Sequence, residues 1–179
     1  MNFLDLVKKR YSCRKYDSAR PVSDEVISRC LEAARLAPSA CNSQPWKFIV
    51  VKTPKLKEEL VSKAFTGIYK MNTFANDASV LVVVVRESSK FVAQLGAFFR
   101  GIRFSLIDSA IATEHFVLQA AEDGVGTCWL GWFNERAVKK MFKIPRGKRV
   151  DTILSMGYPA EDVDCEKIRK SLDEISQVL

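Results

Sequence analysis

The run VLVVVV, residues 80–85, is the longest uninterrupted apolar stretch of the chain. Five of its six residues are valine, and β-branched side chains favour extended backbone. A run that is apolar at every position, rather than at alternate positions, is typical of a strand covered on both faces. We therefore expect a central strand with other elements packed against each side of its sheet.

Capping signals on either side of this run predict the helices. Asn2 begins a helix over residues 3–10, Ser23 begins one that Pro38 stops, and Thr53 precedes one with Pro54 in its first turn. Residues 105–123 form a long apolar pattern that ends at Gly124, and Asn134 begins a short helix after it. Residues 72–77 are expected to form a polar turn, and residues 88–104, aromatic and interrupted by two glycines, suggest a mobile helical flap.

Three further strands are expected, at residues 48–51, within GTCWLGWF (126–133), and within VDTILSMGYP (150–159). Helices and strands therefore mix without strict βαβ alternation, which favours an α+β fold over a doubly wound sheet. We expect one domain over residues 1–179, because 47% of the residues are hydrophobic and no linker or repeat interrupts them. Neither GxGxxG nor GxxxxGK[ST] occurs, which disfavours a Rossmann site and a P-loop.

Composition argues against several classes of function. The net charge of +7 is spread along the whole chain, so we expect either a weakly attractive surface or an anionic small ligand, and no nucleic acid. The longest apolar run is too short to cross a bilayer and the N-terminus does not look like a secretory signal, so the expected location is the cytoplasm, without a membrane. The lone His115 has no partner for acid–base chemistry. Five scattered cysteines without a CxxC pair indicate reduced thiols and no metal site: Cys13, Cys30, Cys41, Cys128 and Cys165.

A cluster of polar side chains follows the first helix. Arg10, Ser12 and Arg14 are spaced by two, so in an extended segment they point the same way and suit a phosphate. The alternative is that they are ordinary surface residues. Lys167 and Arg169, also two apart, either complete the same site or are simply solvated.

The segment APSACNSQPWKFIVV, residues 37–51, contains a loop longer than a simple connection needs. Its Ser39, Asn42 and Gln44 can both donate and accept hydrogen bonds, as the edge of a planar heteroaromatic ring requires. The alternative is a well-bonded helix-to-strand loop in which Trp46 belongs to the core.

Four segments together resemble the FMN-dependent nitroreductase family, in its order and spacing, over nearly the whole chain. They are KKRYSCRKYDSARPV (8–22), APSACNSQPWKFIVV (37–51), DSAIATEHFVLQAAEDGVGTCWLGWF (108–133) and LSMGYPAEDVDCEKIRKSLDEI (154–175). The resemblance implies a mixed, largely antiparallel sheet flanked by helices, in an intertwined homodimer with FMN at the interface.

The resemblance also assigns cofactor-binding positions. Arg10, Ser12 and Arg14 match a segment that holds the flavin phosphate, ribityl chain and part of the ring edge, and Lys167 and Arg169 match a Lys-x-Arg that completes the phosphate site. The loop positions match one that reaches the flavin across the dimer interface: Pro38, Ser39, Ala40, Asn42 and Gln44. Asn72 matches an amide that bonds the isoalloxazine, and Leu130 and Gly131 match a strand end whose backbone approaches the ring.

The function that the resemblance implies is an NAD(P)H-dependent flavin oxidoreductase acting on a nitroaromatic, a quinone or a similar small electron acceptor. Flavin carries this chemistry, so no catalytic side chain and no metal are assigned. The alternative is a flavin-binding protein without general reductase activity, such as a carrier, a sensor or a specialised oxidase. Residues 65–75 and 88–104 are where acceptor specificity is expected. Cys41 and Cys128 lie in flavin-contacting motifs, but we expect packing rather than redox roles for both.

Overall fold

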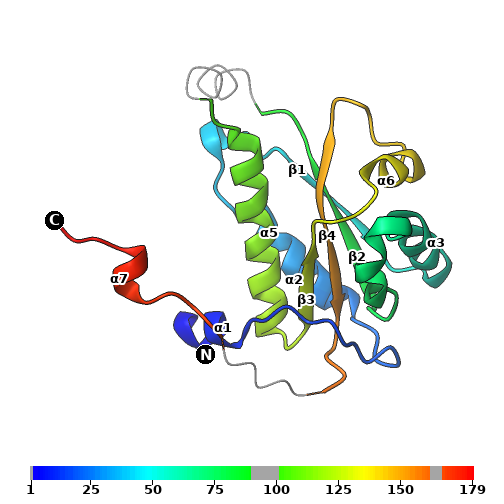
Figure 1. Ribbon diagram of the computed structural model, residues 1–179, viewed down its shortest axis with the longest axis horizontal. Coiled ribbons are helices and arrows are strands. Elements are labelled where there is room, and N and C mark those ends of the chain that lie inside the picture. The colour runs from blue at the N-terminus through cyan, green and yellow to red at the C-terminus, as the bar shows by residue number, and fades with distance from the viewer. Residues whose placement is uncertain (1, 90–100, 162–166) are drawn as a thin grey trace.

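The structure, a computed structural model of the chain, describes residues 2–89, 101–161 and 167–179 (Figure 1). Its sheet has four strands, β1 (Trp46–Val51), β2 (Val80–Arg86), β3 (Gly126–Leu130) and β4 (Arg149–Gly157), in the order β1-β2-β4-β3. All three pairs of neighbouring strands are antiparallel. The one parallel pairing in the described residues is an isolated bridge between Ser12 and Thr127. The expected largely antiparallel sheet in an α+β fold is therefore confirmed.

The strand β2 lies in the middle of the sheet and of the core. Val80, Val82 and Val84 pack with α2 (Asp24–Arg35) and α5 (Phe104–Glu122) on one face. Leu81 and its alternate neighbours pack on the other face, with α3 (Pro54–Ala64) and α6 (Glu135–Met141). Figure 1 shows these two helical layers on opposite sides of the sheet. The continuous apolar run is thus explained by burial on both faces.

Three helix starts have the side-chain caps expected from the sequence, whereas Thr53 at the start of α3 makes no capping hydrogen bond with its side chain. In α1 (Phe3–Lys9) the Asn2 side chain accepts a hydrogen bond from the Asp5 N–H, and Ser23 and Asn134 do the same for α2 and α6. Gly124 follows α5 with φ of 74°, a conformation that glycine adopts at little cost. His115 lies on α5 with Nδ1 3.2 Å from the Ala33 carbonyl oxygen, and so joins α5 to α2, in keeping with a structural role.

Three local expectations need correction or fall outside the structure. Residues 72–77, expected to form a turn, belong largely to a 3₁₀ helix, η2 (Gly67–Asn76). The first strand begins at Trp46, two residues before its expected start. The flap expected at residues 88–104 falls mostly on residues 90–100, which lie outside the described residues.

The two ends of the chain contribute nothing to the described core. Neither α1 nor α7 (Leu172–Ile175) has a buried residue, and α7 extends away from the sheet in Figure 1. Of the helices in the described ranges, none is both long enough and apolar enough to span a bilayer.

Candidate functional site

The segment after α1 runs along the open edge of β3. Ser12 forms a parallel bridge with Thr127, and the Cys13 N–H donates to the Thr127 carbonyl oxygen at 2.9 Å. An edge strand has unpaired backbone groups on its outer side, and this segment satisfies part of them. The pairing places Arg10, Ser12 and Arg14 beside β3.

The guanidinium groups of Arg10 and Arg14 both influence the pKa of one thiol on β3. Burial raises the pKa of the Cys128 thiol, and the nearby Arg14 and Arg10 partly offset that rise. Burial likewise raises the pKa of the Glu114 carboxyl group on α5, and Arg10 works against that shift too. Both arginines therefore lie close enough to the middle of β3 to influence one buried thiol.

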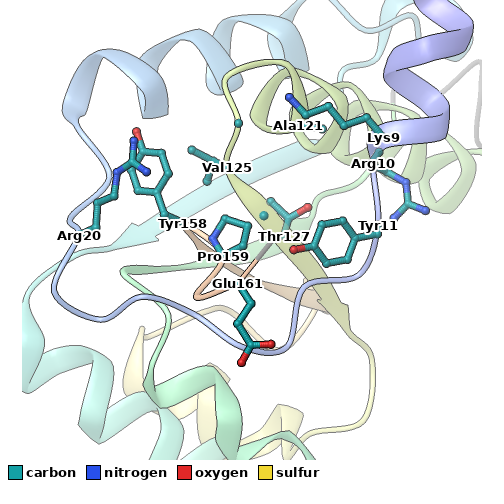
Figure 2. A pocket seen from close by; sticks show the side chains of 12 residues that line it. Lys9, Arg10, Tyr11, Arg20, Ala121, Val125, Thr127, Tyr158, Pro159 and Glu161 are labelled. Carbon is teal, nitrogen blue, oxygen red and sulfur yellow. The ribbon is translucent and has the colours of Figure 1, made fainter. Parts of the chain in front are cut away.

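A cavity of about 480 Å³ adjoins this segment. Figure 2 shows Lys9, Arg10 and Tyr11 on one side of it and Arg20 with Tyr158 on the other. The Arg20 guanidinium stacks over the Tyr158 ring, 3.5 Å from its centroid. The lining contains three basic side chains and one acidic side chain, so the cavity favours an anion.

The C-terminal segment reaches the same region. The Lys167 ammonium donates to the carbonyl oxygen of Val7 at 2.6 Å and also to that of Lys8, in the last turn of α1. This contact places Lys167 close to Arg10. Arg169 is exposed, and its Nη1 donates to the Ile168 carbonyl oxygen at 2.7 Å. The structure thus brings Lys167, but not Arg169, into contact with the turn that carries Arg10.

The far end of β3 is open. Leu130 is buried with its side chain in the core, so at this position only the backbone is available to a ligand. Gly131 is exposed, and a Cβ added there would have no atom within 4 Å. Beside it, Asn72 Nδ2 donates to the Trp132 carbonyl oxygen at 2.9 Å. Asn72 therefore holds the turn that follows Gly131.

Trp132 and Tyr69 complete this end, and both were missed by reasoning from the sequence. The Trp132 indole N–H donates to the Ile68 carbonyl oxygen at 3.0 Å, and the Trp132 ring lies 5.3 Å from the ring of Tyr69. The tryptophan in the segment GWF could have been noticed as an exposed aromatic residue after a strand. Its partners could not, because they come from a segment more than sixty residues earlier. The Trp132 indole therefore connects η2 to the turn after β3.

The loop at residues 38–44 lies elsewhere, on α5. The Ala40 N–H donates to Asp108 Oδ1 at 3.1 Å, and Ser39 Oγ accepts from the Gln44 N–H at 2.9 Å. Asn42 and Gln44 are exposed and bonded to each other through Gln44 Nε2 and Asn42 Oδ1 at 2.8 Å. Within the described part of the chain, no hydrogen bond joins these amides to Arg10 or Gly131. One chain therefore does not bring all the expected positions together.

The cysteines differ in environment. Cys13, Cys30 and Cys128 are buried, as expected of small apolar residues, whereas Cys41 is exposed, contrary to the expected packing role. Cys165 falls outside the described residues. Cys13 sits against β3 so closely that a Cβ on Gly126 would meet the Cys13 Cβ at 2.6 Å. This explains why glycine occupies the start of the strand.

The sequence and the fold of this chain match those of known proteins. A sequence model described as the Nitroreductase family matches residues 7–158. The chain therefore belongs to the Nitroreductase family. It is 34% identical to the "Oxygen-insensitive NADPH nitroreductase" of Helicobacter pylori, with 98% of this chain and 99% of that protein aligned.

Solved structures agree with this assignment. A nitroreductase family protein from Clostridium difficile superposes with a TM-score of 0.81 at 34% identity, covering 99% of this chain and 98% of that one. A protein from Exiguobacterium sibiricum, solved in complex with FMN, superposes with a TM-score of 0.82 at 24% identity, covering 100% of this chain and 98% of that one. At 24% identity, the likeness to the Exiguobacterium sibiricum protein shows a shared fold alone.

Proposed function

We propose that this chain is an FMN-dependent oxidoreductase that passes a hydride from NADH or NADPH, through bound flavin, to a nitroaromatic, a quinone or a similar small acceptor. Membership of the Nitroreductase family supports the class of reaction. The Helicobacter pylori relative is named as an NADPH nitroreductase, and the Exiguobacterium sibiricum structure contains FMN. Both support the choice of co-substrate and cofactor.

The observation that carries the proposal is the position of Lys167. Its ammonium reaches the last carbonyls of α1, so a cation from the C-terminal segment stands beside Arg10. Arg14 acts on the same stretch of β3 as Arg10. This donor set fits a phosphate group, and the open space at Gly131 fits a planar ring brought close to the backbone.

In this function the protein binds and orients, and a bound FMN supplies the hydride-transfer chemistry. Arg10, Arg14 and Lys167 would hold the phosphate, each charge-assisted hydrogen bond contributing about 1.5 to 3 kcal/mol. Gly131 would let the ring approach the end of β3, and the exposed amides of Asn42 and Gln44 would bond a ring edge. No side chain of this chain is assigned as an acid or a base.

The proposal includes a homodimer in the cytoplasm, without nucleic acid or membrane partners. Phe3 is 66% exposed and Leu172 is 76% exposed, although both are large and apolar. A second copy would cover these side chains. It would also bring its loop at residues 38–44 to the cationic site, from which the loop of the same chain is separate.

Spectroscopy of the purified protein, supplemented with FMN, tests the proposal. We expect a bound-flavin visible spectrum that bleaches under anaerobic conditions on addition of NADH or NADPH and returns when a nitroaromatic or a quinone is added. A protein that takes up no FMN would refute the whole proposal. Flavin that binds but is not reduced by either nicotinamide would instead indicate a carrier, sensor or specialised oxidase.

A further inference from the structure

Asp108 is a buried acidic residue that the proposed function does not use. It lies on α5 and is 4% exposed. Its Oδ1 accepts a hydrogen bond from the Ala40 N–H at 3.1 Å, and its Oδ2 is buried with no hydrogen-bond partner among the described residues. A buried carboxyl group with a single partner destabilises the fold compared with an apolar side chain of the same shape. Packing alone does not account for an acid at this position.

The loop that Asp108 contacts has an unusual backbone. Cys41, Asn42 and Gln44 have φ of 53°, 49° and 48°, in the left-handed region that residues with a Cβ seldom adopt. Hydrogen bonds inside the loop link Asn42 to Ser39 at 3.0 Å and Ser43 to Ala40 at 3.1 Å. A strained backbone of this kind persists only where its surroundings hold it.

Hydrogen bonds tie the loop to its surroundings at both ends. In the described ranges, the Ser109 hydroxyl and the Glu87 N–H donate to the Pro45 carbonyl oxygen, and the Trp46 N–H donates to the Gln44 carbonyl oxygen, at the end of the loop. At the start of the loop, the Asp108 carboxyl group accepts from the N–H of Ala40, the residue just before the left-handed turn.

We infer that Asp108 is a positioning residue, whose carboxyl oxygen fixes the Ala40 N–H and thereby holds the loop with the amides of Asn42 and Gln44 facing outward for a flavin. The inference rests on the proposed function for the identity of that ligand. Its structural half, the fixing of the loop, does not depend on any ligand.

Three full-length variants test the inference. Asp108→Leu has the same branching without an acceptor, and its burial removes the cost of the unpaired oxygen, so it is expected to fold. Asp108→Asn keeps an oxygen that can accept from Ala40. Thr113→Val is the matched control, because Thr113 is also buried on α5, five residues after Asp108, and its hydroxyl donates to the Ser109 carbonyl oxygen at 2.7 Å.

The first readout is amide hydrogen exchange, measured without flavin. In Asp108→Leu the backbone N–H groups of Ala40, Asn42 and Gln44 should exchange about tenfold faster than in the wild type. This is the factor expected for the loss of one hydrogen bond. The second readout is the Kd for FMN from flavin fluorescence, which should rise about tenfold in the same variant. Both quantities should stay near the wild-type values in Asp108→Asn and Thr113→Val.

The possible outcomes separate the two ideas. Wild-type exchange rates in a folded Asp108→Leu, or equal effects in Asp108→Asn, overturn the role of the carboxyl oxygen. Faster exchange with an unchanged Kd for FMN shows that the loop is anchored but does not serve the flavin, which also overturns the inference. A wild-type chain that binds no FMN defeats the proposed function, while the exchange data still decide whether Asp108 fixes the loop.

Discussion

The basic residues of the candidate site come from distant parts of the sequence, and two of them lie near the end of α1. Arg10 follows that helix directly, and Lys167 bonds its last carbonyls from the other end of the chain. Across the cavity, Arg20 is held on the Tyr158 ring (Figure 2). The structure therefore offers a test residue and a matched control of the same charge.

Arg10→Ala should raise the Kd for FMN by about 10- to 100-fold, because one charge-assisted hydrogen bond to the phosphate is lost. Quenching of flavin fluorescence measures this Kd, and the loss of affinity should shrink at high salt. Arg20→Ala should change the Kd by less than about threefold, because the Arg20 guanidinium is already stacked on the Tyr158 ring at the far side of the cavity. An equal loss in both variants would place the anion between Arg10 and Arg20 rather than between Arg10 and Lys167.

Thiol reactivity should follow burial. Burial raises the pKa of the Cys13 and Cys128 thiols, and raises the pKa of Cys30 to about 12. At a pH below its pKa a thiol is mostly protonated and unreactive. These three thiols should therefore resist alkylation in the folded protein at about pH 8. Cys41 is exposed and should react. Peptide mass spectrometry after iodoacetamide treatment distinguishes the four, and rapid labelling of Cys128 before unfolding would contradict this prediction.

Among the elements, β3 is closely packed at its start and open to solvent just past its end. At its start, Gly126 faces Cys13 so closely that an added Cβ would also meet the Cys13 sulfur at 2.8 Å. Just past its end, Gly131 faces open space. One glycine is required by close packing, and the other leaves room for a ligand.

Two alanine substitutions separate these roles. Gly126→Ala should lower the free energy of unfolding by about 1 to 3 kcal/mol, because overpacking forces the edge segment outward. Gly131→Ala should change it by less than about 0.5 kcal/mol, while weakening FMN binding if the ring lies against this turn. Urea denaturation and flavin titration measure the two effects. Unchanged FMN binding in Gly131→Ala would argue against a flavin ring at this turn.

Considered as a whole molecule, the chain leaves apolar side chains uncovered at both of its ends. Phe3 and Leu4 on α1 are 66% and 68% exposed, and Ile168 and Leu172 in the tail are 92% and 76% exposed. The tail also lies away from the sheet (Figure 1). Large apolar side chains left exposed at both ends are in keeping with the proposed homodimer, in which a second copy would cover them.

Leu172→Asp combined with Ile175→Asp should therefore shift the full-length protein from dimer to monomer. A charge at a buried interface is costly unless it is paired. Sedimentation velocity measures the shift, and FMN affinity should fall with it. Leu56→Asp is the control, since Leu56 is 38% exposed on α3 in the other helical layer. A wild-type chain that sediments as a monomer would contradict the proposed assembly.

The sequence by itself determined the elements whose causes are local. The valine run predicts β2 because burial on both faces leaves no polar position, and Asn2, Ser23 and Asn134 predict helix starts because each caps a backbone N–H three residues away. The spacing of Arg10, Ser12 and Arg14 and the polar groups of the loop at residues 38–44 indicated a ligand, whereas the assignment of that ligand as flavin came from resemblance to a family.

Tertiary structure alone decided the contacts between distant residues. Asn72 bonds a carbonyl 60 residues away, Ala40 bonds a carboxyl group 68 residues away, and Lys167 reaches across 160 residues to α1. No local pattern encodes such pairs, because they depend on how the helical layers dock on the sheet. The same holds for η2 and for the left-handed loop backbone, whose conformations are stabilised by neighbours that only the folded chain supplies.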